Sequence, residues 1–397
     1  MFKIINSLRA LLFAAFLLFV GNSFLLSSNS IILKELGYTD FYVGLVGSCI
    51  YLGALVGTFF SQSIIQKVGH IRSFGFFISV FGILTLLHIF TKEVFLWAIF
   101  RFGIGFTYYA LVVIIESWIN QKSKNEIRSR MLAVYEIVFY TGFAVGVLLL
   151  YVKPEYDYVF IISVLILMLC AIPLNLLKIK QPKLLDKAKV SIPNIFAVSK
   201  LAFICAFIGG FLMNGFFSMS QTYFLALGYN VKQISMLILL AMFGGFIAQL
   251  FVGKLSDIYG RKLAILTCSL IALISSLCLC IFKSSNNLIY LLIFLLGMGL
   301  FCLYALALAR ASDRAKESSQ VLEIGRSLLF AYILGSVLSP LVLGLMLDIF
   351  GARAYMFVYV ILLLSLFLFT LTQPKIDSIN RIGYDEKPSQ FYYLKNE

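Results

Sequence analysis

The stretch Gly253-Lys254-Leu255-Ser256-Asp257-Ile258-Tyr259-Gly260-Arg261-Lys262 lies between two long apolar segments. A weaker copy occurs 191 residues earlier as Gln62-Ser63-Ile64-Ile65-Gln66-Lys67-Val68-Gly69-His70-Ile71-Arg72, in which Gly69 corresponds to Gly260. This spacing divides the chain of 397 residues into two similar halves. A duplicated membrane protein with a short charged turn at the same place in each half is the usual build of a secondary transporter.

Composition places the chain in a membrane. Apolar residues make up 61% of it and charged residues 13%, and its mean hydropathy is +0.98, whereas a soluble domain carries about 25% charged residues. A helix needs about 20 apolar residues to cross a bilayer. The pattern predicts an all-α integral membrane protein with twelve spans, at roughly 8–33, 41–65, 73–91, 94–118, 130–151, 156–178, 200–226, 234–254, 263–282, 287–309, 324–347 and 352–372.

The basic charge is a topology signal. Of the 32 Lys and Arg residues, 25 fall in the termini and the even-numbered hairpins, while each of the six intervening loops holds one. By the positive-inside rule, both termini and the basic hairpins are cytoplasmic. The net charge of +14 is therefore explained without a nucleic-acid partner, and a multi-pass protein of the cytoplasmic (inner) membrane is expected.

The first apolar run is too long for a signal peptide and precedes no small-residue cleavage site, so it is predicted to be an uncleaved helix.

No cofactor is expected from the motifs. The seven cysteines all lie in apolar spans, without the spacing of a metal site. There is no nucleotide-binding P-loop, which argues against ATP as the driving force.

The repeat extends beyond the charged turn. Leu36-Gly37-Tyr38 matches Leu227-Gly228-Tyr229, and Gly103-Ile104-Gly105 meets Gly297-Met298-Gly299 at an offset of 194. At an offset of 192, Asn22 meets Asn214, Ser28 meets Ser220 and Asn29 meets Gln221. The expected organisation is two pseudo-symmetric six-helix bundles, 1–178 and 200–372, joined by a Lys-rich cytoplasmic linker, 179–199, and followed by a polar cytoplasmic tail, 373–397.

These features resemble the major facilitator superfamily. Residues 253–262 fit its loop pattern of Gly, three residues, Asp, two residues, Gly and two basic residues, although Gln62 and Gln66 depart from it in the first half. Arg101, followed by Gly103 and Gly105, resembles the family's fourth-helix motif. Glu116-Ser117-Trp118-Ile119-Asn120 is similar to the YcaD-like bacterial branch. The resemblance implies a rocker-switch transporter with a central cavity between the halves.

The two charged turns are predicted to form a conformational latch. Asp257 would face the start of the fifth helix near Arg128 to Met131, where a helix N-terminus attracts negative charge. The alternative is a basic loop that only sets topology. The residues assigned to the latch are Gly253, Asp257, Gly260, Arg261, Lys262, Gln66, Gly69, Arg72 and Glu116.

Three charged residues lie within the predicted helices, and each needs a partner, water or a function at membrane depth. Glu116, at the cytoplasmic end of the fourth helix, is predicted to form a gate salt bridge with Arg72, His70 or Arg128, or else to carry a proton. Glu136 is the second proton-coupling candidate, with a permanent pair to Arg130 as its alternative. Arg101 could bind an anionic group of the substrate, or it could have a structural role and donate hydrogen bonds to backbone carbonyls.

In this family the first, fourth, seventh and tenth helices line the cavity, which defines the candidate substrate contacts. Any one small polar residue could instead only join two helices by a hydrogen bond. The candidates are Asn22, Ser28, Asn29, Arg101, Tyr108, Tyr109, Asn214, Ser220, Gln221 and Tyr304.

The fifth helix lacks the proline found in the antiporter motif of this superfamily, which argues against a drug/proton antiporter.

The favoured function is secondary active transport of a small organic solute by a functional monomer, with proton coupling through Glu136 or Glu116. A uniporter and a non-transporting sensor or scaffold are the alternatives. An enzyme is not expected, since no His/Asp cluster or nucleophile–base pair is visible at membrane depth.

Overall fold

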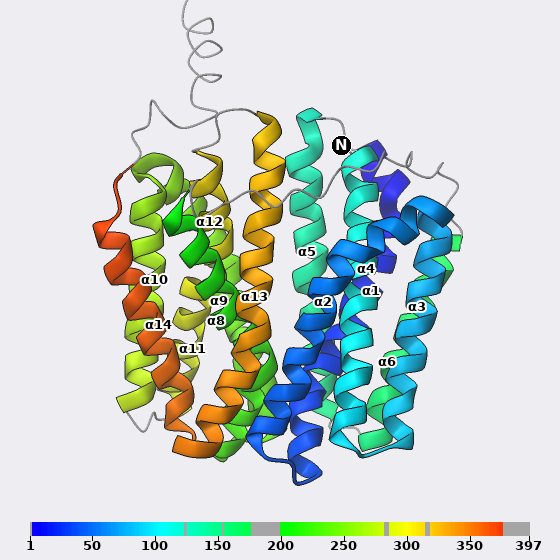
Figure 1. The fold of residues 1–397 in the computed structure, drawn as a ribbon, viewed down its shortest axis with the longest axis horizontal. Coiled ribbons are helices and arrows are strands. Elements are labelled where there is room, and N and C mark those ends of the chain that lie inside the picture. Colours follow the sequence, from blue (N-terminus) through cyan, green and yellow to red (C-terminus); the bar gives the residue numbers. More distant parts are fainter. Residues whose placement is uncertain are drawn as a thin grey trace, which may run out of the picture. The chain divides into compact units, whose positions relative to one another are not determined.

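The computed structural model describes residues 2–122, 125–152, 155–175, 199–281, 286–313 and 318–375, and every regular element within them is a helix (Figure 1). In the first half these are α1 (Phe2–Glu35), α2 (Asp40–Val68), α3 (His70–Leu87), η1 (His88–Phe90), α4 (Val94–Lys122), α5 (Asn125–Leu149), η2 (Leu150–Val152) and α6 (Tyr156–Asn175). In the second half they are α8 (Lys200–Ala226), α9 (Val231–Tyr259), α10 (Arg261–Ile281), α11 (Asn286–Leu300), α12 (Leu303–Ser312), α13 (Ser318–Phe350) and α14 (Arg353–Thr372).

Twelve stretches among the described residues are long and apolar enough to cross a membrane, which confirms the predicted number of spans. The tenth span, Asn287–Ser312, contains both α11 and α12, which are interrupted at Phe301 and Cys302. The helices also run further than the apolar runs. Arg310, which the charge pattern assigned to a hairpin, belongs to α12 and is buried.

The charged turns are therefore helix ends and not loops. One residue, Gly260, separates α9 from α10, and one residue, Gly69, separates α2 from α3. Their φ angles are 98° and 86°, a region that side chains with a Cβ rarely adopt and that glycine enters freely. A positive φ at both positions matches the correspondence of Gly69 and Gly260 in the repeat.

A second pair of glycines corrects the alignment of the repeat. A Cβ built at Gly105 in α4 would lie 1.9 Å from the carbonyl oxygen of Ile50 in α2. A Cβ built at Gly297 in α11 would lie 2.0 Å from the carbonyl oxygen of Ala241 in α9. Each glycine thus lets two helix backbones touch. The structural equivalent of Gly105 is Gly297, at an offset of 192, and not Gly299 as the offset of 194 predicted.

The chain divides into two compact units, residues 1–188 with 215–239 and 337–352, and residues 189–214 with 240–336 and 353–397. Within the first unit, α1 packs against α5 and α6, and α2 packs against α4. Within the second unit, α10 packs against α11 and α14. The predicted bundles 1–178 and 200–372 stay a prediction, and most of the linker and tail lies outside the described residues.

Candidate functional site

Two carboxylates and three tyrosines gather in the first unit, on α4 and α5. Glu116 is half-buried and Glu136 is exposed. The Tyr135 hydroxyl lies close to the Glu116 carboxylate, and Glu116 lies within electrostatic range of Glu136. Tyr108 and Tyr109 are also within electrostatic range of Glu116. The structure thus brings both proton-coupling candidates together with two cavity candidates.

The same network reaches α1. The side chain of Asn22 lies close to that of Tyr108, which lies two turns along α4 from Glu116. Asn22, Tyr108 and the carboxylates therefore form a polar path through three helices, all of them in segments that are apolar overall. Ionisable groups at such depth are retained in membrane proteins mainly for ion, proton or substrate pathways.

The salt bridge predicted for Glu116 is not among the ion pairs of the described residues. Arg72 is exposed, and the Nε2 atom of His70 lies 3.1 Å from the hydroxyl of Ser117. The ring of His70 also meets Trp118 edge to face, with 6.0 Å between ring centroids. Arg128 and Arg130 lie where side chains are not described, so pairing of Glu116 or Glu136 with them stays a prediction.

Arg101 is buried in α4 and serves the backbone of α1. Its side chain is 1% exposed, and its Nη1 donates to the carbonyl oxygen of Leu25 at 3.5 Å. Its Nε and Nη2 atoms have no hydrogen-bond partner among the described residues. This geometry favours the structural alternative, in which the guanidinium ties α4 to α1.

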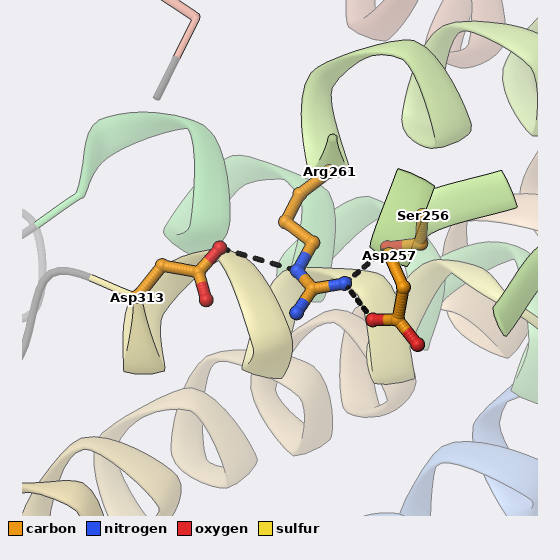
Figure 2. Close-up of polar contacts among 4 residues, drawn as sticks. All are labelled: Ser256, Asp257, Arg261 and Asp313. Carbon is orange, nitrogen blue, oxygen red and sulfur yellow. Dashed lines mark hydrogen bonds and ion pairs between the residues drawn. The ribbon is translucent and has the colours of Figure 1, made fainter. Parts of the chain in front are cut away.

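The charged turn of the second half is organised around Arg261 (Figure 2). Its Nη1 contacts the Asp257 carboxylate at 2.5 Å and the Ser256 hydroxyl at 3.0 Å. Its Nε donates to Oδ2 of Asp313 at 3.1 Å. One guanidinium therefore joins the end of α9, the start of α10 and the end of α12.

Asp257 pairs with Arg261 one helical turn away. Its expected approach to the start of the fifth helix, from Arg128 to Met131, stays a prediction. Gly253 does not serve close packing, because a Cβ there would meet no described atom within 4 Å. Lys262 donates to the carbonyl oxygen of Leu371 at 2.8 Å, which fastens α10 to α14.

The cavity candidates of the second unit make contacts between helices. Asn214 of α8 donates to the Ser336 hydroxyl of α13 at 2.7 Å. The ring of Tyr304 lies 4.7 Å from that of Tyr332, measured between centroids. These two side chains therefore join helices here, as the structural alternative predicted. The four remaining candidates, Ser28, Asn29, Ser220 and Gln221, are buried in the first unit.

Three residues of these sites were not assigned to them from the sequence. Asp313 and Ser256 complete the environment of Arg261, and Tyr135 completes that of Glu116. Asp313 left one usable signal, since it is an acidic residue placed between Arg310 and Arg314. Tyr135 left none beyond its position next to Glu136.

Twelve apolar spans among the described residues, a duplicated glycine turn and a polar path through α1, α4 and α5 define a multi-pass membrane protein of the transporter class. The chain belongs to the Major Facilitator Superfamily, whose family model matches residues 11–325. Membership in this family implies a small-molecule substrate, a membrane setting and a class of proteins that are not enzymes.

Relatives place the chain near the YcaD-like transporters, as the sequence motif predicted. It is 26% identical over 309 residues to an uncharacterized MFS-type transporter of Yersinia enterocolitica, covering 77% of this chain and 80% of the relative. It is 24% identical over 301 residues to the uncharacterized MFS-type transporter YcaD of Escherichia fergusonii, covering 75% and 78%. Its fold is similar to that of the nucleoside transporter NupG, with a TM-score of 0.81, 12% identity and coverage of 92% and 99%.

Proposed function

We propose that this protein is a secondary active transporter that moves a small organic solute across the cytoplasmic membrane by alternating access and couples this movement to protons. In this proposal both termini and the basic hairpins are cytoplasmic, as the distribution of Lys and Arg favours. The functional unit is a monomer, with the solute, protons and the lipid bilayer as its partners.

The proximity of Glu116 and Glu136 is the observation that carries the proposal. Two like charges close together at membrane depth repel each other, so holding one proton between them is easier than keeping both ionised. In this proposal Glu136, which is exposed, exchanges the proton, and the neighbouring Tyr135 hydroxyl assists the carboxylate of Glu116. Asn22 and Tyr108 extend the same polar path into α1, where the binding of a solute could depend on the protonation of Glu116 and Glu136.

In this proposal, contacts at the turns around Gly69 and Gly260 control the change between conformations. Arg261 ties together the cytoplasmic ends of α9, α10 and α12, so that this region moves as one piece. Asp257 is exposed and pairs with Arg261, and a contact that it made in only one state would bias the equilibrium toward that state. The first half has Gln66 in place of the acid, and we expect its contact to be weaker.

Solute flux into proteoliposomes under an imposed pH gradient tests the coupling. We expect uptake or release to respond to the gradient in the natural protein, and to lose that response in the Glu116→Gln, Glu136→Gln double variant. Flux that is equally sensitive to the gradient in both proteins would remove the coupling and leave a uniporter. Deleting 373–397 separates a transporter, which keeps its flux, from a sensor or scaffold that acts through its tail.

A further inference from the structure

The first unit contains a group of buried polar side chains, each with an oxygen atom that has no hydrogen-bond partner among the described residues. They come from α1, α8 and α13, and each is at most 3% exposed. We refer to this group as the polar seam. It consists of Ser27, Asn29, Ser220, Gln221, Thr222 and Ser339, with the unpartnered atoms being the hydroxyls and the amide oxygens Asn29 Oδ1 and Gln221 Oε1.

The helices that carry the polar seam meet at one place. The Ser30 hydroxyl of α1 donates to the carbonyl oxygen of Ser218 in α8 at 2.5 Å. A Cβ built at Gly47 of α2 would lie 3.1 Å from Cβ of Pro340 in α13 and 3.6 Å from Cβ of Ser218. Four helices thus converge on Ser218, and the seam side chains lie within a few residues of this point.

Other hydroxyls in the same stretch are hydrogen-bonded. Ser28 donates to the carbonyl oxygen of Phe24 at 2.7 Å, and Ser30 has its partner across the helix interface. Buried polar groups in proteins are almost always hydrogen-bonded, because an unpaired one loses its water without compensation. Six unpaired groups from three helices therefore indicate that another molecule supplies their partners during the transport cycle.

The chemistry of the seam points to the kind of molecule. All six side chains are hydroxyls or amides without a formal charge, and two of the unpartnered atoms are amide oxygens that accept hydrogen bonds. Asn29 and Gln221 also occupy corresponding positions of the two halves, at an offset of 192. We infer that the polar seam binds a neutral solute that offers several O–H or N–H donors. This inference rests on the proposed transport function and narrows its substrate class.

Thermal unfolding of the purified full-length chain tests the substrate class, because a ligand that binds the folded state raises its Tm. The probes are glucose, inositol and uridine, each paired with a charged counterpart: glucuronate, inositol phosphate and uridine monophosphate. We expect at least one neutral probe at about 10 mM to raise Tm by about 2 °C, and its charged counterpart to have no effect. Stabilisation only by charged probes, or by no neutral probe, would overturn the inference.

A matched pair of variants tests whether the seam is a binding site or only a structural feature. Thr222→Val removes an unpartnered hydroxyl with little change of shape, so Tm without solute should stay the same or rise while the solute-induced shift disappears. Thr370→Val removes a hydroxyl that donates to the carbonyl oxygen of Leu366 at 2.6 Å, so Tm should fall while the shift persists. A fall in Tm for Thr222→Val with an intact shift would contradict the inference.

The readout separates this inference from the proposed function. The solute-induced shift is measured in detergent and requires neither flux nor a pH gradient. A solute-induced rise in Tm without any flux in proteoliposomes would contradict transport and support the polar seam as a binding site. Gradient-sensitive flux of a charged solute, without a rise in Tm from any neutral probe, would support transport and contradict binding of a neutral solute by the seam.

Discussion

The carboxylate of Asp348 binds the backbone amide of Asp40, although the two residues are 308 positions apart. Oδ1 of Asp348 accepts the N–H of Asp40 at 2.8 Å, and Oδ2 accepts that of Phe41 at 2.8 Å. Asp348 near the end of α13 therefore satisfies two of the free amides at the start of α2, where the helix dipole also favours negative charge. Both segments belong to the first unit.

The variant Asp348→Ala should loosen the contact between α2 and α13. The Ser48 hydroxyl of α2, which accepts the N–H of Leu341 at 3.1 Å, lies next to the free thiol of Cys49. We expect Cys49, kept as the sole cysteine, to react several-fold faster with a maleimide, and stability to fall by about 1 kcal/mol for the lost cap.

The control for this experiment is Asp157→Ala, which removes an acidic residue from the first turn of α6. It should lower stability slightly and leave the reactivity of Cys49 unchanged. Equal reactivity of Cys49 in the two variants would show that Asp348 does not hold α2 against α13.

The two carboxylates that hold Arg261 should differ in their value to stability. The side chain of Asp313 is 4% exposed, whereas that of Asp257 is 72% exposed. Asp313→Asn should lower stability by about 2 kcal/mol, because it weakens a charged hydrogen bond that is shielded from water. Asp257→Asn should cost less than about 1 kcal/mol, as is usual for a surface pair. Thermal unfolding of both variants in detergent measures the difference, and equal losses would contradict it.

Asp257 should instead matter to the conformational equilibrium. We expect Asp257→Asn to weaken the state with a closed cytoplasmic side more than Gln66→Ala does, since only the second half retains the acid. The measurement is the labelling rate of single cysteines placed on the cytoplasmic side of the polar path. Equal changes in the labelling rate for the two variants would mean that Asp257 biases the conformational equilibrium no more than Gln66 does.

Gly105 should not accept a side chain. Gly105→Ala places a methyl group 1.9 Å from the carbonyl oxygen of Ile50, so α2 and α4 must separate, and we expect a loss of about 1–3 kcal/mol. Gly75→Ala in α3 is the matched control, because a Cβ there meets no described atom within 4 Å. It should stabilise the helix by up to about 1 kcal/mol. The same direction of change in Tm for both variants would contradict the packing described for α2 and α4.

Tyr135→Phe should weaken proton-driven flux. The variant keeps the ring and removes the hydroxyl that lies beside Glu116, and we expect about a tenfold loss, the size of the effect of a hydrogen bond to a charged group. Solute counterflow without a pH gradient should change little. Tyr290→Phe in α11 is the control and should leave both fluxes unchanged. If Tyr135→Phe lowers gradient-driven flux and counterflow equally, Tyr135 acts on the solute step and not on coupling.

Much of the architecture was predictable because the bilayer imposes it. Length and apolarity identify a spanning helix one segment at a time, so all twelve spans were found. Gly69 and Gly260 were also predictable, since a turn of one residue between two helices needs a conformation that glycine adopts freely. The ends of the helices were not predictable from hydropathy, because α9 and α10 continue through polar residues outside the apolar core.

The sites were predictable only in part. The sequence identified Glu116, Glu136, Asn22 and Tyr108 as residues whose polarity is unusual for their surroundings, and the structure places them on one path. It did not indicate that Asn214 would be used in a bond to Ser336, or that the amide oxygens of Asn29 and Gln221 would both lack partners. Whether a polar side chain meets a partner depends on the rotation and depth of the neighbouring helices, which hydropathy does not encode.

By itself the sequence determined the membrane class, the number of spans, the duplication and the predicted sidedness, because these depend on properties that are local along the chain. The tertiary structure alone decided that Arg261 reaches Asp313 across 52 residues and that Asp348 caps α2 across 308. It also decided which polar groups of α1 and α8 remain unpaired. Such relationships arise from the packing of helix against helix, where a shift of one residue exchanges every partner on the buried face.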